Sequence, residues 1–309
     1  MKEFFFNTIS EFHQFNDFPP PENPLFSVKI SEENKADLSD CENNKLDEPT
    51  SISTGFYSIS LKNVISGDIV YGKTKYDCSS GSLLCTGPNQ TLIFTELVFS
   101  SEWYHISFHK DYLVGTPLYD KIKKFNFFNY YANEALHLSP KEEEFLKPIF
   151  TNIESEYYNT QDEFSKDIIL SQLETLLKYI DRFYKRQFLD RQQLNKDLYS
   201  RFRETLDKYF EANLLSEKGI PTVDWLAQQL NVSHRYMSDM IKTETGRTAI
   251  DQINSYLIDQ AKNLLLNPKL SISETAYQLG FEYPQYFSRL FKKKVGLSPK
   301  QYIESQQLN

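Results

Sequence analysis

The stretch that decides the fold of the C-terminal region is AYQLGFEYPQYFSRLFKK, residues 276–293. Its pattern of a short helix, a tight turn and a second helix occurs twice, because residues 236–246 match residues 286–296 at an offset of fifty. Upstream of the turn the offset is forty-nine, since Ala227 matches Ala276 and one residue is inserted. Two copies are too few for a repeat array, so the sequence predicts a duplicated helical unit.

Capping and turn residues mark the helix boundaries in both copies. Thr222 and Ser233 are suited to cap the two helices of the first copy, and Asn231 lies where a left-handed turn residue is needed. Gly280 takes the same turn position in the second copy. The apolar residues expected to face inward are Val223, Leu226, Ala227, Leu230, Tyr236, Met237, Met240 and Ile241, and in the second copy Phe287, Leu290 and Phe291.

A single helix is expected between the copies, from Thr248 to Asn267, where Pro268 stops it. Its apolar positions fall on one face: Ile250, Ile253, Leu257, Ile258, Ala261, Leu264 and Leu265. About twenty residues at ~1.5 Å each give a rod of roughly 30 Å, close to the ~34 Å of one turn of B-DNA. The spacing predicts that this rod holds the two second helices in successive major grooves on one side of a duplex.

Residues from about Tyr199 to Ile303 resemble the DNA-binding domain of the AraC/XylS-type transcriptional regulators. The resemblance is carried by residues 276–293, by Gly-Leu-Ser-Pro at 296–299 and by Tyr302. It implies a tandem helix-turn-helix domain that binds double-stranded DNA, preceded by a cupin-like sensory domain. It also implies a small-molecule effector, a homodimer, and contact with RNA polymerase or other transcription machinery.

Base-contacting residues are expected at polar positions near the start of each second helix, away from its apolar face. They are Arg235, Ser238 and Asp239 in the first copy, and Gln285, Tyr286, Ser288 and Arg289 in the second. Phosphate contacts are assigned to His234, Lys242, Lys292, Lys293 and Lys294. Asp239 departs from the basic or long polar residue usual in the family. The first helix is therefore expected to bind more weakly, or to depend on Arg235.

Residues 51–138 are expected to form a small antiparallel β-barrel or jelly roll, similar to the cupin-type sensory domain. Short segments rich in β-branched or aromatic residues lie at 56–61, 68–71, 82–85, 91–94 and 103–108, with turn residues at 66–68, 80–81 and 87–89. The predicted fold class is therefore α+β with two domains, an N-terminal barrel with helices and an all-α C-terminal domain.

The expected domains follow from these patterns. Residues 1–50 combine an aromatic, proline-rich arm with an acidic linker, and residues 139–190 predict a helical hairpin opened by a capping box at Ser139 and Glu142. The second helix of the hairpin carries an apolar seam of Ile169, Leu173, Leu176, Ile180 and Phe183, which would pack either on the barrel or on a second copy. The DNA-binding domain is assigned to residues 199–305, with helix-turn-helix units at 222–246 and 271–296.

Composition narrows the functional classes. The chain has 309 residues and a formal net charge of −8, yet from Leu215 onward basic residues number 11 against 9 acidic ones. The three cysteines form no CxxC pair and no apolar run is long enough to span a membrane, so a cytoplasmic, reduced setting without membrane contact is expected. His105 and His109 lie four residues apart on an expected strand but lack the companions of a cupin metal site. No cofactor, metal or catalytic residue is expected.

These observations predict a sequence-specific DNA-binding regulator modulated by a small molecule, and not an enzyme. Two alternatives stay open. The first is a cupin-like enzyme that modifies a small molecule, which bound metal or turnover would support. The second is a protein-interaction module whose helical units no longer bind DNA, which would show no steep loss of DNA binding with salt.

Overall fold

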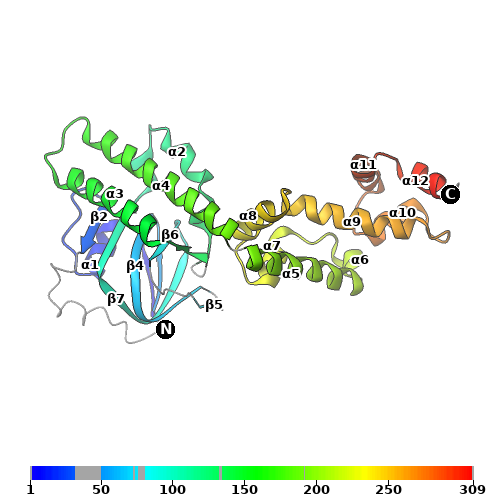
Figure 1. Cartoon of the computed structure of the whole chain (residues 1–309), viewed down its shortest axis with the longest axis horizontal. Helices are drawn as coiled ribbons and strands as arrows, with labels where there is room; N and C mark the ends of the chain where they lie inside the picture. Colours follow the sequence, from blue (N-terminus) through cyan, green and yellow to red (C-terminus); the bar gives the residue numbers. More distant parts are fainter. Residues whose placement is uncertain are drawn as a thin grey trace. The chain divides into compact units, whose positions relative to one another are not determined.

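The computed structural model describes residues 2–31, 50–71, 74–75, 81–131, 134–190 and 192–307. The chain splits into two compact units, residues 1–190 and 191–309 (Figure 1). The first unit combines a β-sheet with helices, and the second is helical throughout its described part. This arrangement confirms the α+β class. The finer boundaries expected at residues 50, 138 and 199 stay predictions.

One sheet organises the N-terminal unit. Its strands are β1 (Lys2–Phe6), β2 (Phe26–Ser31), β3 (Thr50–Thr54), β4 (Tyr57–Tyr71), β5 (Thr74–Lys75), β6 (Ser82–Thr86), β7 (Thr91–Phe108) and β8 (Leu136–His137). The strand order is β1-β3-β7-β4-β6-β8, while β2 also pairs with β7 and β5 with β4. The pairing of β1 with β3 is parallel and the other pairings are antiparallel, so the sheet is not wholly antiparallel as expected.

The long strands differ from the sequence prediction. The segments 56–61 and 68–71 belong to the continuous strand β4, apart from Phe56, and the segments 91–94 and 103–108 both belong to β7. Ser66-Gly67-Asp68 does not reverse the chain, because irregularities in the β4–β7 register absorb these residues within the strand. The expected turn at 87–89 is present, with Asn89 at φ +64°. Because β4 and β7 are long and the sheet is mixed, a cupin-like barrel remains a proposal.

The expected aromatic arm supplies one strand of this sheet and a helix that packs on it. Residues 2–6 form the edge strand β1, and α1 (Ile9–Phe15) follows it. Phe6 and Ile9 are buried together with Phe56, and Phe12 and Phe15 pack around them. The arm therefore shares a small core with Phe56 and Ile52 of the following segment. The acidic linker is expected at residues 31–50; Ser31 ends β2 and Thr50 begins β3, and residues 32–49 lie outside the described residues. Cys41 and Cys78 also lie outside the described residues, whereas Cys85 is free and buried.

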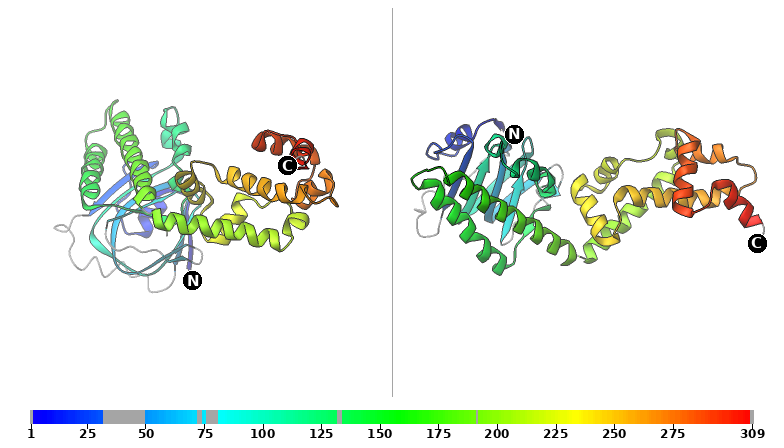
Figure 2. Two further views of the ribbon diagram at one scale, coloured as in Figure 1. Left: turned by 45° about the vertical axis from the view of Figure 1, so that its right-hand side comes forward. Right: turned by 90° about the horizontal axis from the view of Figure 1, so that it is seen from above.

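Helices cover the other side of the sheet. They are α3 (Pro140–Tyr158) and α4 (Ser165–Asp190). The shorter elements η1 (Lys110–Leu113), α2 (Leu118–Lys121), η2 (Ile122–Lys124) and η3 (Asn126–Asn129) lie between β7 and β8 along the chain. The predicted capping box opens α3, since the side chain of Ser139 accepts from the amide of Glu142 and the Glu142 carboxylate accepts from the Ser139 amide. The sheet lies between α1 and the α3–α4 pair (Figure 2).

The apolar seam of α4 is buried inside this unit. Its five residues, Ile169, Leu173, Leu176, Ile180 and Phe183, are all at most 8% exposed. Helix α4 packs on α3 and on β8, so the seam covers the chain's own core. Of the two packings that the sequence left open, the structure supports the one on the protein's own sheet and helices. A second copy would have to use another surface.

The C-terminal unit is a chain of helices. They are α5 (Gln192–Glu211), α6 (Leu214–Lys218), α7 (Val223–Leu230), α8 (His234–Thr245), α9 (Ala249–Leu265), α10 (Ile272–Gln278), α11 (Pro284–Val295) and α12 (Pro299–Gln307). Helix α9 spans 17 residues after its Thr248 cap, which corresponds to ~26 Å. The predicted inward face of α9 is wrong at Ile250, which is 61% exposed, while Leu264 is half-buried. No helix in the described part of the chain is long and apolar enough to cross a membrane.

Candidate nucleic-acid interface

The first helix-turn-helix unit forms as its sequence predicts. The Thr222 hydroxyl accepts a hydrogen bond from the Trp225 amide at 3.1 Å, which caps α7. Asn231 ends α7 in the left-handed conformation, at φ 55° and ψ 42°. Ser233 then caps α8 by accepting from the Tyr236 amide at 3.1 Å. The local signals therefore fix the turn and the start of the second helix.

The second unit repeats this geometry with one change. The side chain of Ser271 caps α10 in a capping box with Glu274. Gly280 takes the turn with φ +79°, as expected for the residue that matches Asn231. At the start of α11, however, Tyr283 occupies the capping position and makes no side-chain hydrogen bond to the helix. Both copies have a left-handed residue in the turn but differ in how their second helices begin.

The turn at Gly280 touches the segment that leads into the first unit. A Cβ at this position would lie 2.7 Å from the carbonyl oxygen of Leu215 and 3.0 Å from backbone atoms of Gly219 and Ile220. The Tyr209 hydroxyl donates to the Gly219 carbonyl at 3.0 Å, which holds this segment in place. The turn of the second helix-turn-helix unit therefore packs closely on the backbone of residues 215–220, which precede the first unit.

The apolar faces of both second helices are buried. In α8 the four predicted residues, Tyr236, Met237, Met240 and Ile241, are all at most 9% exposed. In α11 Phe287 and Phe291 are completely buried, whereas Leu290 is only half-buried, so its predicted place in the core is wrong. Because the inner faces of α8 and α11 are fixed by this packing, their polar faces are directed away from the core.

The predicted base-contacting residues lie on these outer faces. Arg235, Gln285, Tyr286 and Arg289 are exposed, and Ser238, Asp239 and Ser288 are half-buried. Helices α8 and α11 both pack on α9, and Figure 1 shows them toward its two ends. The structure therefore presents two similar polar surfaces separated along one rod. Contact of these residues with bases stays a prediction.

The predicted phosphate-contacting residues divide into two groups. Lys242, Lys292 and Lys293 are exposed, without an ion pair among the described residues. His234 instead lies 3.1 Å from the Asp224 carboxylate. Lys294 is half-buried, with its ammonium 3.5 Å from Asp251.

The position of Lys294 gives it a structural role. Its ammonium also lies 3.4 Å from the Ser255 hydroxyl of α9. A hydrogen bond from Thr248 and the charges of Lys294 and Lys293 lower the pKa of Asp251. Lys294 therefore ties α11 to α9, and its assignment to phosphate stays a prediction.

The charge of the two second helices differs. Helix α8 carries Asp239 and Glu244 beside Arg235 and Lys242, so its charges balance apart from His234. Helix α11 carries Arg289 and three successive lysines and no acidic residue. Because binding to the DNA backbone depends on positive charge, α11 is better suited to hold phosphates. This difference agrees with the expectation that the first unit binds more weakly.

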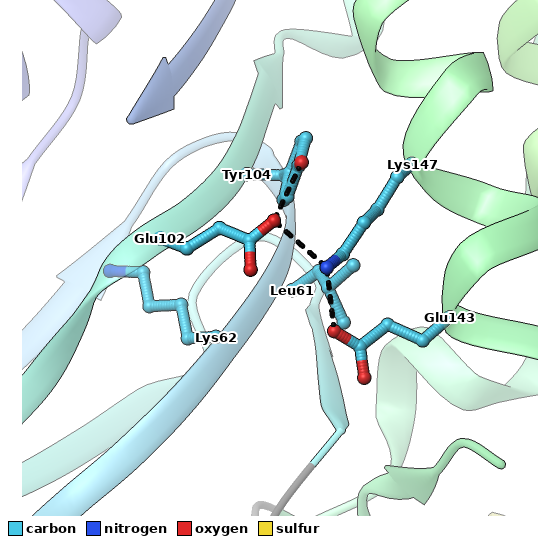
Figure 3. A pocket seen from close by; sticks show the side chains of 6 residues that line it. All are labelled: Leu61, Lys62, Glu102, Tyr104, Glu143 and Lys147. Atoms are coloured by element: carbon cyan, nitrogen blue, oxygen red, sulfur yellow. Dashed lines mark hydrogen bonds and ion pairs between the residues drawn. The ribbon is translucent and has the colours of Figure 1, made fainter. Parts of the chain in front are cut away.

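A second cluster of charged residues lies in the N-terminal unit, between β7 and α3 (Figure 3). The Lys147 ammonium lies 2.8 Å from Glu102 and 3.0 Å from Glu143, and the Tyr104 hydroxyl donates to Glu102 at 3.0 Å. Burial alone would lower the pKa of Lys147, but the bonds and charges of both glutamates outweigh burial and raise it to about 12. The charged groups of the cluster pair with one another and connect β7 to α3.

Metal-binding chemistry is not indicated in the described ranges. They contain no group of three His, Cys, Asp or Glu residues arranged to hold a metal ion. His105 lies in β7, where its ring nitrogens bond to the hydroxyls of Ser60 at 2.7 Å and Ser107 at 2.8 Å. His109 lies beyond the end of β7, which stops at Phe108, and its side chain caps η1. The two histidines therefore do not form a pair on one strand.

Comparison with known proteins places the similarity in the helical unit. Residues 226–305 match the family described as "Helix-turn-helix domain". An uncharacterized HTH-type transcriptional regulator of Pseudoalteromonas carrageenovora is 38% identical over 94 residues, which cover 30% of this chain and 54% of that protein. The HTH-type transcriptional activator RhaR of Salmonella dublin is 35% identical over 107 residues, covering 34% of this chain and 38% of the relative. The chain thus matches about half or less of these relatives.

Among solved structures, the C-terminal domain of AraT, a response regulator from Geobacillus stearothermophilus, shows 36% sequence identity. The alignment covers 35% of this chain and 84% of that domain, with a TM-score of 0.31. The family match, at residues 226–305, lies within the C-terminal helices.

Proposed function

We propose that this chain, in which residues 226–305 form an AraC-type helix-turn-helix domain, is a sequence-specific DNA-binding transcriptional regulator of the cytoplasm. One observation carries the proposal. The polar faces of α8 and α11 are exposed toward the two ends of α9, a helix whose ~26 Å length is of the order of one turn of B-DNA. Two such helices can enter successive major grooves.

The residues on these faces take different roles in the proposal. Arg235 and Arg289 suit guanine and Gln285 suits adenine, because each can form two hydrogen bonds to one base edge. Ser238, Asp239, Tyr286 and Ser288 complete the surface that faces the bases. Lys242, Lys292 and Lys293 neutralise phosphates and position the protein without reading sequence.

Effector binding is proposed for the face of the sheet that α1 covers. Ser60 and Lys62 of β4 pair with His105 and Trp103 of β7, so the four side chains share that face. Phe12 stacks on His105 with ring centroids 5.6 Å apart, and Phe18 stacks on Trp103 at 5.7 Å. A polar sheet face under an aromatic cover is suited to bind a small molecule, because polar groups orient it and aromatic rings enclose it.

The chemistry of this face favours an anionic effector. The Lys62 ammonium lies 5.5 Å from the centre of the Trp103 ring, and burial lowers the pKa of Lys62 to about 8, so Lys62 is mostly charged at neutral pH. Ser82 pairs in register with Lys62, and its buried hydroxyl has no hydrogen-bond partner among the described residues. A carboxylate or phosphate bound here would accept a hydrogen bond from the Ser82 hydroxyl and lie close to the Lys62 ammonium. Lys62→Met is expected to abolish any thermal shift that such anions cause.

A homodimer and contact with RNA polymerase or other transcription machinery complete the proposal. Two copies would double the DNA contacts and raise the affinity for a paired site. Sedimentation of the full chain with and without DNA tests the dimer. A sedimenting species that stays monomeric on a two-fold symmetric site would remove this part of the proposal.

Selection of bound fragments from genomic DNA, followed by a salt titration, tests the main proposal. The regulator is expected to enrich a defined site and to lose affinity steeply between 50 mM and 200 mM salt. An interaction module would enrich no site and show no such loss. The enzyme alternative predicts instead that the full chain turns over a small molecule independently of DNA.

A further inference from the structure

The two helix-turn-helix units differ at the residue that begins the second helix. In the first unit Ser233 caps α8 through its hydroxyl. The matching residue in the second unit is Tyr283, which has extended backbone at φ −129° and ψ 120° and gives α11 no side-chain cap. Serine is among the preferred residues at this position and an aromatic residue is not. The second unit therefore lacks a stabilising hydrogen bond that the first unit has.

The Tyr283 side chain is directed to solvent instead of the core. Tyr283 is 48% exposed, and its ring packs edge-on against the Tyr286 ring, with centroids 5.7 Å apart and planes at 82°. Tyr286 is 55% exposed and belongs to the predicted base-contacting surface. Neither ring belongs to the core that Phe287 and Phe291 form under α11. Two neighbouring exposed aromatic rings thus lie at the start of the more basic second helix.

A residue that breaks a local folding rule without filling the core is expected to serve a binding site. Exposed aromatic side chains are enriched where surfaces bind partners, because they supply contact area with few rotatable bonds. In helix-turn-helix proteins the N-terminal residues of the second helix contact base edges, and tyrosine hydroxyls donate to phosphates. The neighbouring Gln285 and Arg289 are exposed beside the pair.

We propose that Tyr283 is a DNA-contacting and positioning residue, which donates its hydroxyl to a phosphate and holds the Tyr286 ring against the 5-methyl group of a thymine. The proposal rests on the DNA-binding function proposed above. Apolar contact with the thymine methyl is a known means of base recognition in the major groove. Tyr283 therefore gives α11 no capping hydrogen bond but positions Tyr286 for a contact that distinguishes thymine.

Replacing Tyr283 by serine separates a binding role from a structural one. Tyr283→Ser restores the capping residue of the first unit, so the thermal midpoint of the C-terminal unit should rise. DNA affinity should fall several-fold at the same time. A residue with only a structural role would change both quantities in the same direction. Tyr283→Phe, which keeps the ring, should lose affinity equally on all sequences and keep the thymine preference.

The methyl contact is measured by fluorescence anisotropy on the selected site, with each thymine in turn replaced by deoxyuridine. The wild-type chain should lose about three- to tenfold affinity at one such position, and Tyr283→Ser and Tyr286→Ala should be insensitive there. Tyr158→Ser removes a tyrosine of the same 48% exposure from the N-terminal unit and serves as the matched control. It should bind like wild type.

The outcomes separate this inference from the proposed function. If the wild-type chain binds no DNA, the regulator assignment fails. If the wild type binds and Tyr283→Ser binds equally well, or no deoxyuridine substitution changes affinity, the assignment stands and the role of Tyr283 is overturned. Should Tyr283→Ser fail to fold, the stability gain is refuted, and the uniform loss expected of Tyr283→Phe still tests the phosphate contact.

Discussion

Replacing Gly280 by alanine should test whether the turn of the second unit is fixed by its neighbours or only by its own backbone. Gly280 has φ +79°, and the left-handed conformation costs a non-glycine residue about 1–2 kcal/mol. The new Cβ would also lie 2.7 Å from the Leu215 carbonyl oxygen and 3.0 Å from backbone atoms of Gly219 and Ile220. Backbone atoms cannot rotate away, and overpacking of this kind costs about 1–3 kcal/mol.

Gly280→Ala is therefore expected to lower the free energy of unfolding of the C-terminal unit by about 2–5 kcal/mol. Gly296 provides a matched control, since it has φ +87° but no heavy atom of the described residues within 4 Å of the position that a Cβ would take. Gly296→Ala should cost only the conformational part, about 1–2 kcal/mol. Gly280→Asn should relieve part of the conformational cost, as Asn231 does in the first unit, but keep the collision.

Urea unfolding of the full chain provides the measurement. The chain has two tryptophans, and a Trp103→Phe background leaves Trp225 as the fluorescent reporter of the C-terminal unit. Trp225 packs edge-on against Tyr209, with ring centroids 4.9 Å apart, so unfolding of this unit should change its emission. Equal losses for Gly280→Ala and Gly296→Ala would refute the reasoning, because the close approach of Gly280 to the backbone of residues 215–220 would then contribute nothing.

Three further predictions concern DNA contacts, helix capping and pH. Arg289→Ala should weaken the free energy of binding to the selected site by roughly 1–3 kcal/mol and relax the preference at one base. Lys293→Ala should weaken binding to every sequence and reduce the slope of affinity against salt by about one. If Arg289→Ala lost the same affinity on all sequences, Arg289 would be a phosphate contact. Ser233→Ala should destabilise the C-terminal unit by about 1 kcal/mol in urea unfolding, and an unchanged midpoint would contradict its capping role. Burial and neighbouring positive charges lower the pKa of His105 to about 3, so the unfolded chain binds more protons below pH ~6.5 and stability should fall by about 1–2 kcal/mol between pH 7.5 and 5. His105→Gln should flatten this part of the pH profile, and an unaltered slope would exclude His105 as its source.

The local features of the helical unit could be predicted from sequence. Caps at Thr222 and Ser233 and turns at Asn231 and Gly280 all form as expected. These features depend on a side chain and on backbone groups within a few residues of it, so the sequence contains the whole interaction. The duplication adds a second, independent instance of the same pattern, which makes the assignment to a helix-turn-helix domain specific.

Longer-range features were decided by the tertiary structure. Whether residues 66–68 turn the chain or continue β4 depends on the pairing of β4 with β7, which lies elsewhere in the sequence. The bond of Lys294 to Asp251, the exposure of Ile250 and the packing of Gly280 on Leu215 likewise need both partners in place. Sequence alone determined the caps at Thr222 and Ser233 and the turns at Asn231 and Gly280, because those interactions are local. Only the fold decided which polar side chains remain on the surface, because burial is set by neighbours that are distant along the chain.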